Sequence, residues 1–279
     1  MSNQRTHYVT TADGVTIGGT VHGQGPPLVF VHAGLGDGDL DWQPLRPHLT
    51  GRFTCHLPSQ RGRGLSGDHP NLSFGRMVDD IIAYVDSIEE PTGLVGYSEG
   101  AILALGAVAA QPDAVSAVAA FEPGFPDFAD EQQQAEIGET LAHIGELAAQ
   151  GDPTAAVRAL LGFTFSDEEM AVVEDTGYLQ ASGRYLPNLL TLFQRWTESG
   201  GLTAPDPAVL GAISTPVLVL LGSETSSPFL TASARHVADH APNARLRQIP
   251  GAGHAAPLTH PEALADALTG FLASALQPA

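Results

Sequence analysis

Lysine is absent from this sequence, and cysteine occurs only once. The 12 basic residues are therefore all arginines, and against 31 acidic residues they leave a formal net charge of −19. A surface of this sign repels nucleic-acid phosphates and anionic lipids, so we expect neither nucleic acid nor a membrane as a partner. Because Cys55 stands alone, the chain can form no internal disulfide and no thiolate zinc cluster.

Long apolar segments are also missing. The longest run covers residues 101–110 and stops at Gln111 and Pro112, well short of the roughly twenty residues that a membrane span needs. The ten residues after Met1 are mostly polar, unlike a secretory signal. No dinucleotide fingerprint or metal-ligand spacing is present either. These absences predict a cytoplasmic protein that needs no cofactor and no metal.

Short apolar runs bounded by glycine and proline recur along the chain, and they predict β-strands. The runs cover residues 28–32, 53–57, 92–97, 115–121, 216–222 and 245–249. Amphipathic helical patterns lie between them, most clearly over 73–88 and from Pro261 onward. Two more polar segments, near Tyr8 and Ile17, predict an antiparallel edge. The alternation predicts an α/β fold with a mostly parallel, eight-stranded sheet covered by helices on both faces.

The alternation of strands and helices stops after the sixth predicted strand. Residues 125–213 are rich in helical patterns interrupted by proline and glycine, and a strand pattern resumes only at Pro216. We interpret 125–213 as a helical cap inserted into a core formed by residues 1–124 and 214–279. A chain of 279 residues suits one α/β domain with such an insertion.

Ser98 lies in the sequence Gly-Tyr-Ser-Glu-Gly, which matches the G-x-S-x-G pattern of a nucleophile elbow. In a chain with 31 glycines such a match arises by chance about one time in five, so its surroundings decide its value. An apolar strand enters the motif and an apolar helical run leaves it, as the sharp turn of an elbow requires. This context favours Ser98 as a catalytic nucleophile over a buried structural serine.

A serine nucleophile needs a base, and His254 is the best placed of the 11 histidines. It follows the turn Gly251-Ala252-Gly253, between the last predicted strand and the last helix. This position overhangs the strand ends and favours a general base. The alternative is a histidine that only shapes the turn.

Two glutamates compete for the role of the carboxylate that orients the base. Glu122 directly follows an apolar strand, where a carboxylate is costly to bury unless it is paired. Glu224 lies in a loop rich in serine and threonine, where water is expected to reach it. We favour Glu122 and keep Glu224 as the alternative; a histidine supported by neither carboxylate is the third reading.

Acyl transfer also needs N–H donors for the oxyanion that forms. The backbone amide of Glu99, directly after the nucleophile, is one candidate, and the amide of Gly34, in a loop after an apolar strand, is the other. The plain alternative for that loop is an ordinary glycine turn. The Glu99 side chain is unusual beside a nucleophile: it either repels anionic substrates or simply favours a helix N-terminus.

These motifs, in this order, resemble the α/β-hydrolase fold family over nearly the whole chain. Four segments carry the resemblance, namely residues 32–34, 61–66, 96–100 and 251–254. The sequence departs from the family pattern at Ala33, where glycine is usual, and at Ser59, where aspartate is common. Many members carry the acid after the penultimate strand, where this chain has Thr225. Glu122 is instead similar to the glutamate after the sixth strand of zearalenone lactonases and haloalkane dehalogenases.

The resemblance implies acyl transfer, because Ser98 excludes the aspartate nucleophile of dehalogenases and epoxide hydrolases. We expect a serine hydrolase that cleaves a small partner molecule, a medium-sized apolar carboxylic ester or lactone, through an acyl-enzyme. Phe125, Phe128 and Trp196 of the cap and Leu35 of the core are expected to line its cavity. The alternatives are C–C bond hydrolysis, cofactor-free perhydrolysis or cyanohydrin cleavage on the same triad, and a non-catalytic ligand-binding protein. A homodimer is left open.

Overall fold

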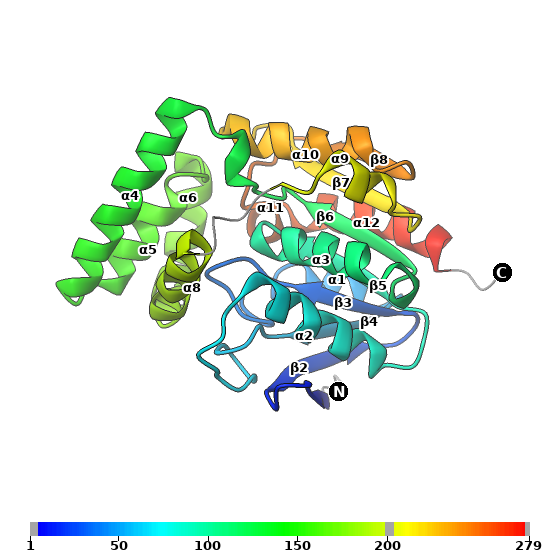
Figure 1. Cartoon of the computed structure of the whole chain (residues 1–279). Helices are drawn as coiled ribbons and strands as arrows, with labels where there is room; N and C mark the ends of the chain where they lie inside the picture. Colours follow the sequence, from blue (N-terminus) through cyan, green and yellow to red (C-terminus); the bar gives the residue numbers. More distant parts are fainter. Residues whose placement is uncertain (1–4, 199–203, 277–279) are drawn as a thin grey trace.

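In the part of the chain that the computed structural model describes, residues 5–198 and 204–276, eight strands form one sheet (Figure 1). They are β1 (Arg5–Thr10), β2 (Thr16–Gly23), β3 (Pro27–Val31), β4 (Thr54–Pro58), β5 (Gly93–Tyr97), β6 (Ala117–Phe121), β7 (Val217–Gly222) and β8 (Ala244–Ile249). Their order is β1-β2-β4-β3-β5-β6-β7-β8. Strand β2 is antiparallel to both neighbours and all other pairs are parallel. The predicted mostly parallel sheet with an antiparallel edge is confirmed.

Helices cover both faces of this sheet, as its apolar strands require. On β3, Leu28 and Phe30 belong to one hydrophobic core and Val29 and Val31 to the other, because successive side chains alternate across a strand. The first face is covered by α1 (Arg46–Leu49), α11 (Ala256–Thr259) and α12 (Pro261–Ala275). The second face is covered by α2 (Phe74–Asp86), α3 (Glu99–Ala110) and α10 (Pro228–His240).

Helix α3 is apolar on nearly all sides because it is buried on nearly all sides. It packs against β5, β6 and β3 below it and against α2 beside it. It begins at Glu99, directly after Ser98, so a rigid buried helix fixes the residue that precedes it. No helix within the described ranges is long and apolar enough to cross a membrane.

The described segment between β6 and β7 contains helices and no strand. These are η2 (Pro126–Phe128), α4 (Glu131–Ala149), α5 (Pro153–Leu161), α6 (Asp167–Asp175), α7 (Tyr178–Gly183), α8 (Leu186–Glu198) and α9 (Pro207–Gly211). Figure 1 shows α4, α5, α6 and α8 gathered beyond one end of the sheet. The first and last elements, η2 and α9, pack instead against α10 of the core. The boundaries 125–213 of the cap stay a prediction.

Candidate active site

Ser98 stands on the turn between β5 and α3, at the carboxyl end of a central strand. Its backbone has φ 56° and ψ −118°, a strained conformation for a residue with a side chain. The turn can close because glycines stand two residues before and two residues after Ser98. A Cβ on Gly96 would lie 2.4 Å from the Gly100 carbonyl oxygen, and one on Gly100 would lie 2.1 Å from that of Val31. The sequence thus enforces the sharp turn of a nucleophile elbow.

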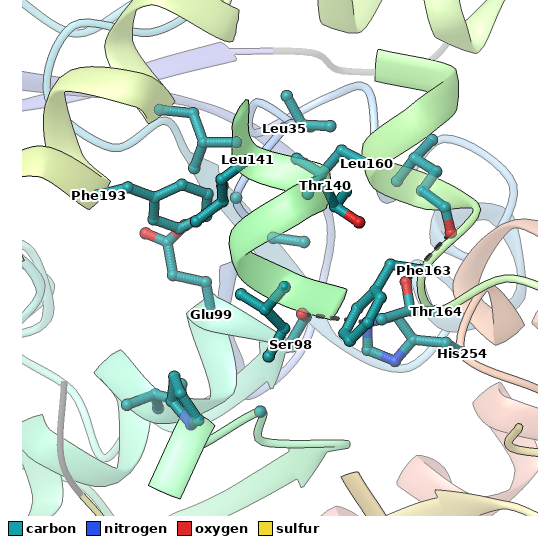
Figure 2. A pocket seen from close by; sticks show the side chains of 18 of the residues that line it. Leu35, Ser98, Glu99, Thr140, Leu141, Leu160, Phe163, Thr164, Phe193 and His254 are labelled. Atoms are coloured by element: carbon teal, nitrogen blue, oxygen red, sulfur yellow. Dashed lines mark hydrogen bonds between the residues drawn. The ribbon is translucent and has the colours of Figure 1, made fainter. Parts of the chain in front are cut away.

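A chain of hydrogen bonds runs from Ser98 through His254 to Glu122. The Nε2 atom of His254 lies 3.1 Å from the Ser98 hydroxyl oxygen, and its Nδ1 atom lies 2.6 Å from Oε2 of Glu122. These residues follow β5, β6 and β8, so they meet at the edge of the sheet where the parallel strands end. Figure 2 shows the hydrogen bond between Ser98 and His254. The imidazole can accept the serine proton while the carboxylate holds its other nitrogen.

The Glu122 carboxylate is completely buried and surrounded by hydrogen-bond donors. Its Oε1 atom accepts a hydrogen bond from the Gly222 amide at 2.7 Å and another from the Thr225 hydroxyl, while Oε2 faces His254. These donors replace water around the carboxylate, which makes its burial tolerable. Thr225 occupies the position at which many members of the family carry the acid. In this chain its hydroxyl instead donates a hydrogen bond to the Glu122 carboxylate.

The competing glutamate, Glu224, lies away from the imidazole. Its side chain is exposed, and its Oε1 atom accepts a hydrogen bond from the neighbouring Ser223 hydroxyl at 3.2 Å. Its backbone amide donates to the Ala252 carbonyl oxygen at 2.9 Å, which fixes the loop with the side chain in solvent. The structure brings Glu122 rather than Glu224 to His254.

The loop that carries His254 is held in place from the cap. Glu169, on α6, accepts a hydrogen bond from the Ala255 amide at 2.8 Å. A Cβ on Gly253 would lie 2.6 Å from the same carboxylate, so this approach requires glycine. The Phe165 ring meets the imidazole edge-on, with 6.0 Å between centroids. Sequence reasoning missed Glu169, because no local pattern connects it with an amide 86 residues further along the chain.

The two amides predicted to bind an oxyanion belong to residues at the same cavity as Ser98. The Glu99 amide opens α3, and the first amides of a helix have no acceptor within it. The Gly34 loop is anchored by the Ala33 amide, which donates to Oδ2 of Asp41 at 2.8 Å. The Gly34 amide has no acceptor among the residues that the structure describes. Both amides can therefore donate to a ligand oxygen.

A cavity of about 410 Å³ opens beside Ser98, lined by residues of both the core and the cap (Figure 2). Apolar side chains dominate its lining. Those at its wall include Leu35, Ile102, Leu141, Leu160, Phe163, Leu189, Phe193 and Trp196. Leu35 and Trp196 had been named as substrate-binding candidates from the sequence. The size and lining suit a small apolar ligand.

The other two substrate-binding candidates, Phe125 and Phe128, do not line this cavity, and that expectation is corrected. The Phe125 amide donates to the Ser233 hydroxyl at 3.1 Å, and its side chain is buried in the core. The Phe128 ring lies 5.0 Å from the His236 ring. Ser233 and His236 are both on α10, so the packing of η2 on α10 turns the two phenylalanines away. Neighbouring Pro126 lines the cavity in their place.

Ionisable groups are also buried at and beside the cavity, and burial shifts their pKa values. Burial raises the pKa of Asp41 to about 7, although the Tyr178 hydroxyl donates to its Oδ1 atom at 2.8 Å. Burial raises the pKa of Glu99 as well, against the opposing charge of Arg63. Arg63 is buried and donates through Nε to Oδ1 of Asn188 at 2.9 Å. Because Tyr178 and Asn188 belong to the cap, these bonds join the cap to the core.

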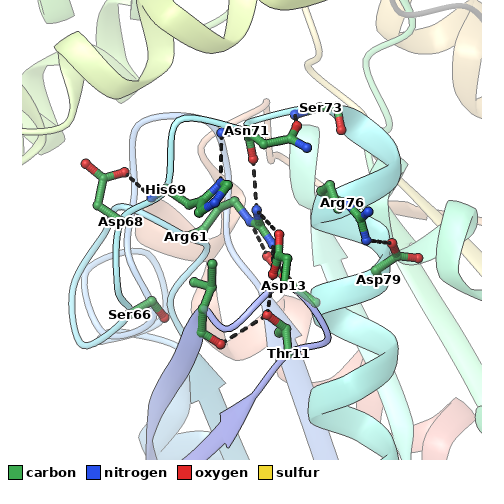
Figure 3. Close-up of polar contacts among 12 residues, drawn as sticks. Thr11, Asp13, Arg61, Ser66, Asp68, His69, Asn71, Ser73, Arg76 and Asp79 are labelled. Atoms are coloured by element: carbon green, nitrogen blue, oxygen red, sulfur yellow. Dashed lines mark hydrogen bonds and ion pairs between the residues drawn. The ribbon is translucent and has the colours of Figure 1, made fainter.

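The segment 61–66, which carried part of the family resemblance, forms a structural support. The guanidinium of Arg61 lies 2.6 Å from Oδ1 of Asp80 on α2. It also lies 3.0 Å from Oδ2 of Asp13 in the β1–β2 turn (Figure 3). Burial alone would lower the pKa of Arg61, but these two carboxylates raise it. The Ser66 hydroxyl donates to the Ser59 carbonyl oxygen at 2.5 Å. This network fixes the loop from which Arg63 reaches the cap.

The strand order and the serine at a sharp strand-to-helix turn, hydrogen-bonded to a histidine, define the class of α/β hydrolases. The sequence model of the alpha/beta hydrolase family matches residues 28–267, and the chain belongs to this family. The resemblance noted from the motifs is thereby confirmed.

Several known proteins are similar over almost their full length. BpoC of Mycobacterium tuberculosis, whose name assigns it provisionally to the non-heme bromoperoxidases, is 29% identical, covering 91% of this chain and 96% of BpoC. A pimeloyl-[acyl-carrier protein] methyl ester esterase of Xanthomonas campestris is 27% identical, covering 91% of this chain and 98% of the esterase. The crystal structure of an alpha/beta hydrolase from Sphaerobacter thermophilus superposes with a TM-score of 0.73 at 27% identity, covering 95% and 100% of the two chains.

Proposed function

We propose that this hydrolase cleaves a medium-sized, apolar carboxylic ester or lactone through an acyl-enzyme on Ser98. The observation that carries the proposal is the hydrogen-bonded series of Ser98, His254 and Glu122 at the wall of an apolar cavity. The name of the esterase relative, which acts on a methyl ester, agrees with this class of substrate.

The reaction has two half-reactions. The Ser98 oxygen attacks the carbonyl carbon while Nε2 of His254 takes the hydroxyl proton, and Glu122 stabilises the imidazolium that forms. The backbone amides of Gly34 and Glu99 donate to the oxyanion. As the intermediate collapses, the carbon–oxygen bond to the alcohol breaks and His254 gives the proton to that alcohol. Water then attacks the acyl carbon with the same base, and Ser98 regains its proton.

A panel of substrates tests this proposal. We expect purified protein to hydrolyse p-nitrophenyl butyrate, p-nitrophenyl hexanoate or medium-sized lactones, and the Ser98→Ala variant to lose at least about a thousandfold in kcat/KM. Turnover of a β-diketone or a cyanohydrin without turnover of any ester would favour the alternative reactions on the same triad. A folded protein that turns over nothing in the panel would favour the non-catalytic reading.

Perhydrolysis is a second candidate, favoured by the name of BpoC. It needs only that hydrogen peroxide replaces water as the nucleophile that attacks the acyl-enzyme, which releases a peroxy acid and restores Ser98. Peroxy acid formed from an ester and hydrogen peroxide, compared in wild type and Ser98→Ala, measures it directly. A ratio of peroxy acid to carboxylic acid well below 1 at molar peroxide would leave hydrolysis as the main reaction.

A further inference from the structure

No arginine lines the cavity in the part of the chain that the structure describes. Among the described residues that line it, the only acids are Glu99 and Asp127, the only basic side chain is His254, and no arginine is present. Asp127 is exposed and its Oδ2 atom accepts a hydrogen bond from the Ala204 amide at 2.9 Å, so water and the backbone already satisfy it. Glu99 is the acid that remains inside the apolar part of the cavity.

The carboxyl group of Glu99 has no hydrogen-bond partner among the residues that the structure describes. Both of its oxygens are buried, and neither has a donor or acceptor within the described chain. Arg63 lies beyond ion-pair distance, although its charge influences Glu99. An unpartnered buried carboxyl group lowers stability, so a protein that keeps one at its active site has a use for it. Burial raises the pKa of Glu99, and in either protonation state an oxygen of the carboxyl group can accept a hydrogen bond from a ligand.

The position of this carboxyl group indicates which part of a substrate it faces. An added Cβ on Gly34 would lie 2.7 Å from Oε2 of Glu99, so the carboxyl adjoins the loop predicted to bind the oxyanion. Figure 2 shows the Glu99 side chain on the opposite side of Ser98 from His254. His254 protonates the leaving alcohol, so the alcohol part must lie on its side. The acyl part is therefore the part that Glu99 meets.

We infer that Glu99 selects substrates whose acyl part is uncharged and carries a hydroxyl or amide group, and that the cavity rejects acyl parts that carry a carboxylate. A hydroxyl or amide donates a hydrogen bond to a carboxyl oxygen, which supplies the partner that Glu99 lacks among the described residues. A carboxylate would lose its water in a cavity whose described lining includes no arginine to pair with it. This inference rests on the proposed function, because it assumes that an acyl group is bound at Ser98.

Matched esters of one chain length test it. The substrates are the p-nitrophenyl esters of hexanoate, 3-hydroxyhexanoate and 6-hydroxyhexanoate, and the mono-p-nitrophenyl ester of adipate. The proteins are the wild type, Glu99→Gln, which keeps a donor and an acceptor, and Glu99→Leu and Glu99→Met, which remove both. Asp127→Asn is the control at the other acid of the wall.

In the wild type, kcat/KM for one of the hydroxylated esters should exceed that for hexanoate about tenfold, which corresponds to one well-formed hydrogen bond. The ratio should fall to about 1 in Glu99→Leu or Glu99→Met and persist in Glu99→Gln and Asp127→Asn. The adipate ester should be at least about a hundredfold poorer than hexanoate in the wild type.

Failure of this inference and failure of the proposed function give different results. A wild type that hydrolyses hexanoate without preferring either hydroxylated ester, or with a preference that survives Glu99→Leu and Glu99→Met, overturns the role of Glu99 alone. Hydrolysis of the adipate ester as fast as the hexanoate ester overturns the predicted rejection of carboxylates. A wild type that hydrolyses none of the esters overturns the proposed function, and this inference with it.

Discussion

The core and the cap meet at one cavity, but they contribute to it in different ways. From the core come Ser98, Glu122 and His254, each one or a few residues beyond the carboxyl end of a strand, where short loops leave little freedom. From the cap come helical side chains such as Glu169 and Tyr178, whose contacts with the core span long stretches of sequence. The difference suggests that the core sets the chemistry, while the cap adjusts the shape of the cavity and the position of the base.

The largest effect should come from the carboxylate on the core side. Glu122→Gln should lower kcat by about a hundredfold to ten-thousandfold, because an amide cannot stabilise the imidazolium or fix its tautomer. Glu224→Gln, at an exposed side chain that contacts Ser223, should change kcat less than twofold. Steady-state hydrolysis of one p-nitrophenyl ester by both variants measures the contrast. Equal losses in the two variants would contradict the assignment of Glu122.

A smaller effect should come from the cap. The two carboxylate oxygens of Glu169 accept hydrogen bonds from the backbone amides of Ala255 and Ser166. Glutamine keeps one oxygen, so Glu169→Gln leaves one of these amides without an acceptor. We expect kcat to fall about tenfold with KM nearly unchanged, because the variant loosens the loop of His254 rather than the cavity wall. Glu168→Gln, at the exposed neighbouring residue, is the matched control.

The ratio of the two kinetic constants separates the roles of the cap. If Glu169→Gln instead raised KM and left kcat unchanged, the cap residue would act on substrate binding and not on the base. If Glu168→Gln lowered kcat as much as Glu169→Gln does, the effect would arise from the general charge of α6. Either result would contradict the proposal that this cap residue positions the catalytic base of the core.

The third effect concerns stability, not activity, at the junction of core and cap. The pKa of Asp41 is raised from 3.8 to about 7 in the folded protein, mainly by burial, so the folded state holds this proton more tightly than the unfolded state. The contribution of Asp41 to stability is therefore complete below pH 3.8, falls as the pH rises from 3.8 to about 7, and is constant above.

Urea unfolding of the wild type and Asp41→Asn at intervals from pH 4 to 8 measures this dependence. The free energy of unfolding of the wild type should fall relative to that of Asp41→Asn between about pH 4 and 7, and then run parallel to it. A difference between the two proteins that stays constant over the whole range would mean that Asp41 is not protonated in the folded state.

Much of the fold could be predicted from the sequence because the central strands are continuous apolar runs. The predicted limits of the core strands differ from the structure by one or two residues, as for 115–121 against Ala117–Phe121. The places of Ser98 and His254 were predictable because glycines force tight turns directly after strands. The burial argument favoured Glu122 over Glu224, but the donors to its carboxylate from Gly222 and Thr225 were not predictable, since they depend on how loops after neighbouring strands fold together.

The cap was harder to predict because its side chains are oriented by contacts that no local pattern records. Phe125 and Phe128 were placed in the cavity on their aromatic character, whereas the packing of η2 on α10 points them elsewhere. The contact of Arg63 with Asn188 joins residues 125 positions apart. Such pairs follow from the way the cap docks on the core, and the amphipathic pattern of a helix does not encode that docking.

The central claim is that Ser98 is a nucleophile activated by His254 and Glu122, and intact-protein mass spectrometry after incubation with a fluorophosphonate tests it most directly. We predict one covalent adduct on the wild type, no adduct on Ser98→Ala, and slower labelling of His254→Ala and Glu122→Gln than of Glu224→Gln. A folded wild type that forms no adduct, or a Ser98→Ala variant that is labelled as fast as the wild type, would contradict the account.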